Sequence, residues 1–375
     1  MSIRRVSVFL PRDTEFYRGL LPQILRGFTA AGVEATGALG HPGAAAMREH
    51  CALHRPDLVF EMNRPRRDAE FVPAGIAHVC WVVDFNGRPL TYFEGSEATY
   101  LFGESWVRHY PHAGFHAWMG PGACEHDYAV TPHVPTFDTS FAGHMPNPWS
   151  EAELARDLTG RGACSFGELL PEIEQLLRTL PVDRSPDDLL GAVDQACRAR
   201  SGHPLLPDDV LRYDICGRTV RHVNRTDLVD AALAQTQRLA LYGPVNWSRW
   251  PHYAAHYRGW LGEPAAMRRA YGESATNLHE GTGIHFRSMD VMCSGGVVLW
   301  RTTPHDHLHG GIAEQFEAGV HYVPFELGNL GERLGELLDD PARAARIRVA
   351  AAAAIRAGHT WRHRAQTILR DVAAL

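Results

Sequence analysis

Short apolar runs alternate with stretches of helical spacing in the first third of the chain. The runs with the length of buried strands are 4–10, 57–62, 77–85, 97–105 and 115–120. Between the first two of these runs, residues 17–32 repeat apolar side chains at helical spacing and end on Gly32, a residue that commonly terminates helices. Strands and helices that alternate at this pace predict a parallel α/β sheet.

The same pattern begins again near Asp138. A strand with a glycine turn is expected at 138–144, and a mostly helical stretch follows at about 150–235. The later expected elements are a strand and turn at 238–247, strands at 275–279, 295–300 and 321–326, a helix around 264–271, and a final alanine- and arginine-rich helix broken near Gly358. The sequence therefore predicts an α/β fold of two Rossmann-like domains that face each other across a cleft, with a helical stretch early in the second. The predicted domains are 1–137 and 138–375.

Composition limits the classes of function. A chain of 375 residues is long for one hydrophobic core, which agrees with two domains. Its formal net charge of −6 argues against a nucleic-acid partner, because such proteins are normally basic. The sequence contains no apolar run long enough for a membrane span and no secretory signal. The seven cysteines are scattered and form no CxxC pair, so a reducing, cytoplasmic location is expected.

The stretch "HEGTGIHFRSMDVMCSGG" (279–296) combines a glycine loop and polar side chains directly before an apolar strand. A helix is expected over about 285–293, and the N–H groups at its start favour an anion or sugar oxygens. Arg287 and Asp290 share one face of that helix, where the arginine suits a phosphate and the carboxylate suits a ribose diol. The alternative is a structural loop followed by an Arg287–Asp290 pair on a solvated helix.

From "RLALYG" (238–243) to its end, the sequence resembles the C-terminal domain of CgeB-type, spore-maturation-like glycosyltransferases with the GT-B fold. The motifs that carry the resemblance are "LYGPVNW", "YGESATNLHEGTGIHFRSMDVMCSGGVVLW", "EQFEAGVHYVPF" and "AGHTWRHRA". The chain has Asp290 where the family usually has glutamate. A second departure from the family is the long helical stretch before "RLALYG".

The resemblance implies a hexosyltransferase-like enzyme that moves a sugar from a nucleotide-sugar co-substrate to a glycan, a protein or a small molecule. It also implies that no cofactor or metal is needed, because helix termini and basic side chains stabilise the departing diphosphate. The last helix is expected to pack back on the first domain. The expected donor-binding residues are Asn246, Tyr253, Asn277, Glu280, Gly281, Gly283, His285, Arg287 and Asp290. The alternatives are a non-catalytic nucleotide- or carbohydrate-binding protein and a sugar-nucleotide epimerase.

Two catalytic candidates follow strands of the first domain. Asp84 follows "WVV" and Asp13 follows the first strand, with Glu15 close behind it. An inverting transferase needs a carboxylate or a histidine to accept the proton of the acceptor, whereas a retaining enzyme does not. From these positions, Asp84 is the first candidate for the catalytic base and Asp13 is the second.

Two further clusters have competing interpretations. The histidines of "RTTPHDHLHGG" (301–311) invite a metal site, but their spacing matches no known zinc motif, and a loop beside the donor phosphates is favoured. In "PVNWSRWPHY" (244–253) an aromatic ring is placed either to stack on the nucleotide base or to pack in the core.

Overall fold

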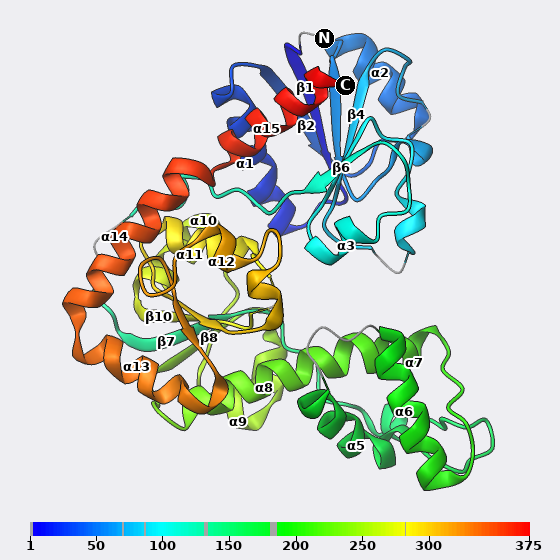
Figure 1. Cartoon of the computed structure of the whole chain (residues 1–375), viewed down its shortest axis with the longest axis vertical. Helices are drawn as coiled ribbons and strands as arrows, with labels where there is room; N and C mark the ends of the chain where they lie inside the picture. The colour runs from blue at the N-terminus through cyan, green and yellow to red at the C-terminus, as the bar shows by residue number, and fades with distance from the viewer. Residues whose placement is uncertain (1–2, 70, 86–87, 131–133, 181–185, 282) are drawn as a thin grey trace.

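The computed structural model describes residues 3–69, 71–85, 88–130, 134–180, 186–281 and 283–375. The chain forms two parallel six-stranded sheets in successive domains, and a helical lobe projects from the second (Figure 1). The predicted α/β class and two-domain architecture are confirmed. None of the described helices is both long and apolar enough to cross a membrane.

The first domain has the strand order β2-β1-β3-β4-β5-β6. Its strands are β1 (Arg5–Leu10), β2 (Glu34–Leu39), β3 (Leu58–Met62), β4 (Ala77–Val82), β5 (Ala98–Leu101) and β6 (Phe115–Trp118). Its helices are α1 (Glu15–Ala30), α2 (Ala44–His54) and α3 (Glu104–Arg108), with 3₁₀ turns at Arg66–Asp68 and Leu90–Tyr92. Strands β3 and β4 are almost entirely buried, because helices or loops cover both faces of the sheet.

The second domain has the strand order β12-β11-β10-β7-β8-β9. Its strands are β7 (Phe137–Ala142), β8 (Leu239–Tyr242), β9 (Tyr257–Gly259), β10 (Ser274–His279), β11 (Val298–Arg301) and β12 (Val323–Phe325). The order of connection reverses between β7 and β10, which are neighbours in the sheet. Ligands of such sheets bind beyond the carboxyl ends of the strands at this reversal.

The helical stretch between β7 and β8 forms a lobe with its own core. Its helices are α4 (Glu151–Leu154), α5 (Phe166–Thr179), α6 (Pro186–Ser201), α7 (Asp209–Tyr213), a π-helical turn (Asp214–Thr219) and α8 (Val220–Leu233). Apolar side chains such as Leu169, Ile173 and Val193 pack together in this core, which is separate from the cores of both sheets. Helix α8 runs from the lobe back into the second domain, so it carries lobe residues to the cleft (Figure 1).

The remaining helices follow the strands of the second domain. They are η4 (Val245–Arg249), α9 (Pro251–Ala254), α10 (Pro264–Gly272), α11 (Phe286–Cys293), η5 (Pro304–His307), α12 (Ile312–Gln315), η6 (Leu327–Asn329), α13 (Leu330–Asp339), α14 (Pro341–Gly358) and α15 (Trp361–Ala374). Helix α14 leads toward the first domain, and α15 lies beside α1 there (Figure 1). The hydroxyl of Tyr100 on β5 donates to Asp371 of α15, with the two oxygens 2.9 Å apart.

An aromatic cluster joins the two domains at α11. The Phe286 ring lies 5.9 Å from that of Trp81 on β4 and 5.8 Å from that of Phe102, measured between centroids. Trp361 at the start of α15 completes the cluster, 5.5 Å from Trp81. Helix α11 is therefore fixed against the first domain as well as its own, which restricts its orientation at the cleft.

Two parts of the first domain differ from the expected elements. The expected strand at 97–105 ends at Leu101, because a turn follows and α3 begins at Glu104. The region between the first helix and residue 57 contains β2 and α2, which the apolar pattern does not predict. Strand β2 has the sequence EATGAL, and as an edge strand it lacks the run of large buried side chains that marks the central strands.

The contact between α1 and α15 yields a stability prediction. A Cβ atom on Gly27 of α1 would lie 2.6 Å from the Cβ of Trp361, so Gly27→Ala must push α15 away from α1. Overpacking of this kind costs roughly 1–3 kcal/mol. Gly191→Ala is the control, because an added Cβ there meets no atom within 4 Å and the helix gains about 0.5–1 kcal/mol. In denaturant unfolding, the midpoint should fall for Gly27→Ala and rise for Gly191→Ala. Equal midpoint shifts in the two variants would contradict the packing of α15 on α1.

Candidate active site

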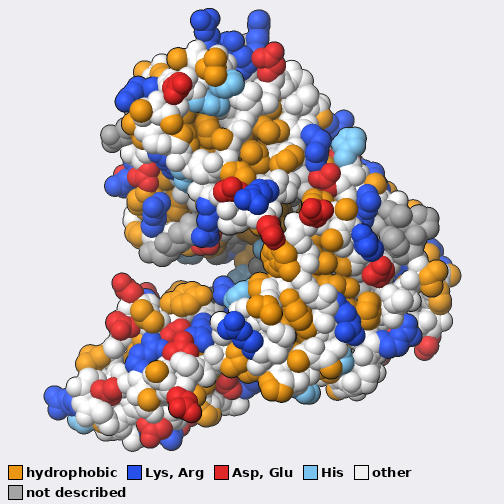
Figure 2. Space-filling model, turned by 180° about the vertical axis from the view of Figure 1, so that it is seen from behind, with side chains coloured by type: hydrophobic (Ala, Val, Ile, Leu, Met, Phe, Trp, Pro, Cys, Tyr) orange, Lys and Arg blue, Asp and Glu red, His pale blue; other side chains and the backbone are white. Residues whose placement is uncertain are grey.

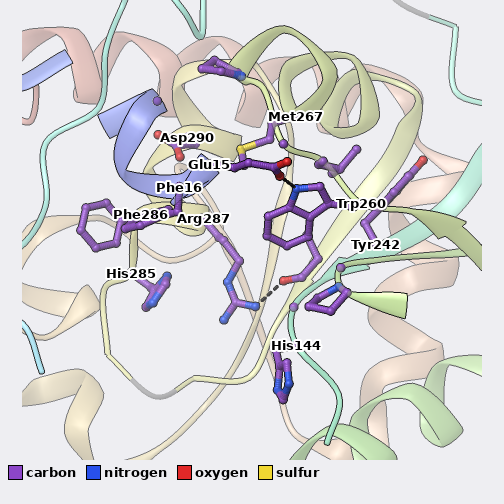
Figure 3. A pocket seen from close by; sticks show the side chains of 18 of the residues that line it. Glu15, Phe16, His144, Tyr242, Trp260, Met267, His285, Phe286, Arg287 and Asp290 are labelled. Carbon is purple, nitrogen blue, oxygen red and sulfur yellow. Dashed lines mark hydrogen bonds between the residues drawn. The ribbon is translucent and has the colours of Figure 1, made fainter. Parts of the chain in front are cut away.

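A cavity of about 610 Å³ lies between the two domains. Its first-domain wall is the start of α1, including Glu15 and Phe16. Its second-domain wall contains the ends of β7 and β8 and helix α11 (Figure 3). Two arginines of α8, Arg221 and Arg225, also line this wall. This position is the reversal point of the second sheet, and the volume suits a small-molecule ligand.

One buried carboxylate organises the polar wall of the cavity. Glu280, directly after β10, is 7% exposed and accepts hydrogen bonds from Arg225 Nε and Nη2 and from Arg287 Nη2, each over 3.0 Å. Burial alone would raise the pKa of Glu280, but the two guanidinium groups outweigh burial and hold that pKa well below its ordinary value. Glu280 is therefore ionised, and the cluster of two arginines and one carboxylate carries a net positive charge.

The arginine cluster keeps unused hydrogen-bond donors. Arg225 Nη1 and Arg287 Nε are buried and have no hydrogen-bond partner among the described residues. Arg221, one helical turn before Arg225, also lines the cavity and forms no ion pair in the described part of the chain. Buried donors are normally satisfied, so this wall is suited to receive an anion.

The glycine loop after β10 is held in place from behind. Gly281 has a φ of +74°, and a Cβ atom there would lie 1.9 Å from the carbonyl oxygen of Arg301, so only glycine fits. Its N–H donates to His279 Nδ1 over 3.1 Å, and the His279 ring stacks on Trp300 at 4.2 Å. Burial lowers the pKa of His279 to about 3, so the imidazole is neutral and accepts this hydrogen bond.

Three of the predicted donor-binding residues line the cavity. His285, Arg287 and Asp290 all face it from the region of α11 (Figure 3). Arg287 lies between the backbone carbonyl of Ala142, to which it donates, and Glu280. Burial raises the pKa of Asp290 well above its ordinary value, and a hydrogen bond with Tyr128 opposes that effect.

The alternative of a solvated Arg287–Asp290 pair is wrong. Arg287 forms its ion pair with Glu280, and Asp290 is only 8% exposed. The two side chains share one face of α11, as the spacing predicts, but that face is turned into the cavity and the domain interface rather than into solvent.

Other predicted residues act at the edge of the cavity or behind it. Glu280 and Gly281 shape the wall from behind, as described above. Gly283 lines a second cavity on the other side of the loop. Asn246 Nδ2 lies 3.3 Å from Nε2 of His144, and His144 itself lines the first cavity.

Four predicted residues are not brought to the cavity. Tyr253 is buried in the second-domain core, with its hydroxyl donating to Asp230 over 2.8 Å. Asn277 is buried between β7 and β10 and accepts from Ser140 Oγ over 2.9 Å. Asp13 is paired with Arg18 at the surface, and the exposed Asp84 follows β4 outside the residues that line the cavity.

The aromatic cluster at 244–253 and the histidine-rich loop have defined surroundings. Trp247 is fully buried and donates to the carbonyl of Gly143, so it packs in the core rather than stacking on a ligand. Asp306 of the histidine-rich loop is buried and accepts from Trp300 Nε1 over 2.9 Å. Within the described ranges, no group of three or more His, Cys, Asp or Glu side chains has a metal-binding arrangement.

Several cavity residues have no counterpart among the predicted ones. Arg221 and Arg225 come from the helical stretch, and His144 follows β7. The first two stand four apart in "RTVRHVNRTD" (218–227). That spacing indicates that both arginines lie on one face of a helix. The local sequence does not show that this face of α8 reaches the cleft.

Comparisons with known proteins agree with this architecture. Residues 221–370 match a family model described as glycosyl transferase-like, and this interval contains Arg225, Glu280 and Arg287. No curated protein matches the sequence. The prediction of a glycosyltransferase is confirmed at the level of this domain.

Solved structures resemble the whole chain. HepE of Anabaena in complex with UDP-glucose is 12% identical, with 99% of this chain and 100% of that chain covered and a TM-score of 0.51. AviGT4, a glycosyltransferase involved in avilamycin A biosynthesis, is 10% identical, with coverages of 99% and 97% and a TM-score of 0.49. The similarity to HepE shows the fold of the chain, a two-domain GT-B architecture with a glycosyl transferase-like domain in its second half.

The neutral His279 behind the loop yields a pH prediction. The pKa of His279 is about 3 in the folded protein and 6.5 ordinarily. Between pH 3 and pH 6.5 this residue is therefore protonated in the unfolded chain but not in the folded one. Stability must therefore fall as the pH drops from 7, by about 2 kcal/mol at pH 5 from this residue. The free energy of unfolding of His279→Asn should therefore fall by about 2 kcal/mol less than that of wild type between pH 7 and pH 5. The variant is expected to be less stable than wild type at both pH values.

The exposed His307 supplies the control for this measurement. His307→Asn should keep the pH dependence of wild type in denaturant unfolding at pH 7 and pH 5. An unchanged pH dependence in His279→Asn would contradict a neutral, buried imidazole behind the glycine loop.

Proposed function

We propose that this protein is a CgeB-type glycosyltransferase that transfers a sugar from a uridine diphosphate sugar. The main support for this proposal is the arginine cluster. Arg225 and Arg287 share the single carboxylate of Glu280, and each keeps a hydrogen-bond donor without a partner among the described residues. Arg221 adds a further positive charge at the same wall. A diphosphate supplies the negative charge and the acceptor oxygens that this arrangement lacks.

The arginines act on the leaving group. In the transfer, the oxygen of an acceptor hydroxyl attacks the anomeric carbon, and the bond to the diphosphate breaks with its electron pair going to the phosphate. The hydroxyl proton passes to a base or to the departing diphosphate. Donors that are already oriented toward the growing phosphate charge lower the barrier without reorganisation, and the buried Glu280 provides that orientation.

The assignment of uridine diphosphate rests on similarity. HepE, which has the same fold, was solved in complexes with UDP-glucose and with UDP. In this chain, Trp260 at the cavity is 49% exposed and offers an aromatic surface to a base. Asp290 lines the cavity, where its carboxyl oxygens can accept hydrogen bonds from ribose hydroxyls.

The first domain brings an acidic side chain to the donor cavity. Glu15 at the start of α1 lines this cavity and accepts a hydrogen bond from Trp260 Nε1, so it supports the ring that faces the nucleobase. Asp13 and Asp84, the predicted bases, do not line the cavity. The CgeB-type placement rests on the motifs "LYGPVNW" and "AGHTWRHRA". A reducing, cytoplasmic setting is proposed from the seven cysteines, which are scattered along the chain and form no CxxC pair.

A ligand screen tests the function. Thermal shift with UDP-, GDP-, dTDP- and ADP-sugars should single out a UDP-sugar, and release of UDP from that donor should accelerate when an acceptor is added. Binding without release in the presence of any acceptor would favour the non-catalytic alternative. Conversion of the bound sugar to its epimer without transfer would favour an epimerase.

Arg287 provides a prediction on turnover. Arg287→Ala removes one oriented donor and should lower kcat by about 10²–10³-fold. Arg287→Lys keeps the charge but loses the planar fork, so it should retain UDP affinity better than rate. The control is Arg346→Ala, whose side chain is 70% exposed. Near-wild-type turnover in Arg287→Ala would remove this residue from the donor site.

Metal independence is a separate prediction. The arginine cluster supplies the positive charge that a divalent cation supplies in other transferases, so turnover should be unchanged after EDTA treatment. The measurement is the rate of UDP release before and after chelation, with added magnesium or manganese as the comparison. A loss of rate that either ion restores would contradict the proposal.

A further inference from the structure

A second cavity, of about 510 Å³, lies on the other side of the glycine loop. The first domain contributes Phe102 and Trp118 at the ends of β5 and β6, and Trp106 of α3. The helical lobe contributes the end of α5 and one face of α8. Figure 2 shows the open hollow between the first domain and the lobe.

The two cavities are separated by one layer of aromatic side chains. Gly283 and Ile284 line the second cavity, whereas His285 and Phe286 line the first. Phe102 bridges the two sides, with its ring 6.0 Å from His285 and 5.8 Å from Phe286. A molecule in the second cavity therefore approaches the donor cavity at the start of α11.

The walls of the second cavity are mainly apolar. Three aromatic rings, Phe102, Trp106 and Trp118, face Val220 and Val223 of α8. Such a surface gains free energy by covering apolar area. The polar side chains among these apolar ones are Arg178, Asn224, Asp227, Arg301 and His305. The shape and lining suit a molecule with an aromatic or aliphatic body.

One charge in this cavity is left over. Arg178 is matched by Asp227, whose carboxylate accepts from both Nε and Nη2 of that arginine. Arg301, at the end of β11, forms no ion pair within the described part of the chain. Burial lowers its pKa, and the more distant charges of Asp227 and Glu280 partly offset that effect. An unmatched guanidinium beside an apolar wall favours a ligand with a carboxylate or a similar anion.

We propose that the second cavity binds the sugar acceptor, and that this acceptor has an apolar, aromatic body with an anionic group that faces Arg301. The inference rests on the proposed function, because it places the acceptor hydroxyl beside the donor sugar at Phe102. It also gives the helical lobe a role, since α5 and α8 form one wall of the acceptor site.

A pair of fluorescent probes tests the chemistry of this cavity. The first probe is 8-anilinonaphthalene-1-sulfonate, and the second is N-phenyl-1-naphthylamine, which has the same aromatic body without the sulfonate. Arg301→Gln should weaken binding of the sulfonate about tenfold and leave the amine unchanged. Trp106→Ala should weaken both probes, and the exposed Arg346→Gln should weaken neither. Saturating UDP should not displace either probe.

UDP affinity, measured by calorimetry, separates this proposal from the donor site. Both cavity variants should bind UDP like wild type. Displacement of the probes by UDP, or equal binding of the sulfonate by wild type, Arg301→Gln and Trp106→Ala, would overturn the acceptor assignment. A failure of wild type to bind UDP would instead overturn the donor site.

Turnover then tests the class of acceptor. With UDP-glucose as donor, UDP release should be fastest with 4-hydroxycinnamate, slower with its methyl ester and slowest with glucose. Arg301→Gln should remove the difference between the acid and the ester. A preference for glucose, equal rates with acid and ester in wild type, or no turnover with any of the three despite intact UDP binding would overturn the assigned acceptor class.

Discussion

The buried carboxylate of Glu280 is the constraint on which the cleft depends. It has a charge that is costly to bury alone, and it is stable there only because Arg225 and Arg287 both donate to it. The reverse also holds, since burial lowers the pKa of Arg225 and Glu280 opposes that effect. The three side chains come from α8, the end of β10 and α11, so one ionic cluster fixes the lobe, the sheet and the site helix relative to one another.

The aromatic contacts of α11 complement this ionic cluster. Phe286 follows the glycine loop and packs on Trp81 of the first domain, so the helix that presents Arg287 is held from both domains. Phe102 then divides the interdomain space into two cavities with different chemistry. The first presents the arginine cluster and suits a diphosphate, and the second combines three aromatic rings with Arg301. A transferase needs two adjacent compartments of this kind, because donor and acceptor must meet at one bond.

The sequence predicts the architecture well where buried strands appear as apolar runs, as β3 and β4 do in the first sheet and β8 and β11 do in the second. The central strands β7 (FDTSFA) and β10 (SATNLH) are mixed in character and are marked instead by the glycine turns that follow them. The sequence also identifies the "HEGTGIHFRSMD" loop (279–290), whose glycines and charges have no role in a simple core. It fails at β2 and α2, where an edge strand lacks the run of large buried side chains. Tyr253 and Asn277 fall near the right loops, yet tertiary packing turns both side chains into the core. Arg221 and Arg225 were missed because their approach to the cleft depends on the direction of α8, which no local pattern encodes.

The most direct test of the arginine cluster compares UDP with uridine in wild-type protein by isothermal titration calorimetry. The nucleoside has the same base and ribose, so the difference in affinity reports the diphosphate contacts alone. Two charge-assisted hydrogen bonds, at about 1.5 kcal/mol each, predict that UDP binds roughly 100-fold more tightly than uridine. Equal affinities for UDP and uridine would contradict the account, because the arginines around Glu280 would then contribute nothing to the ligand.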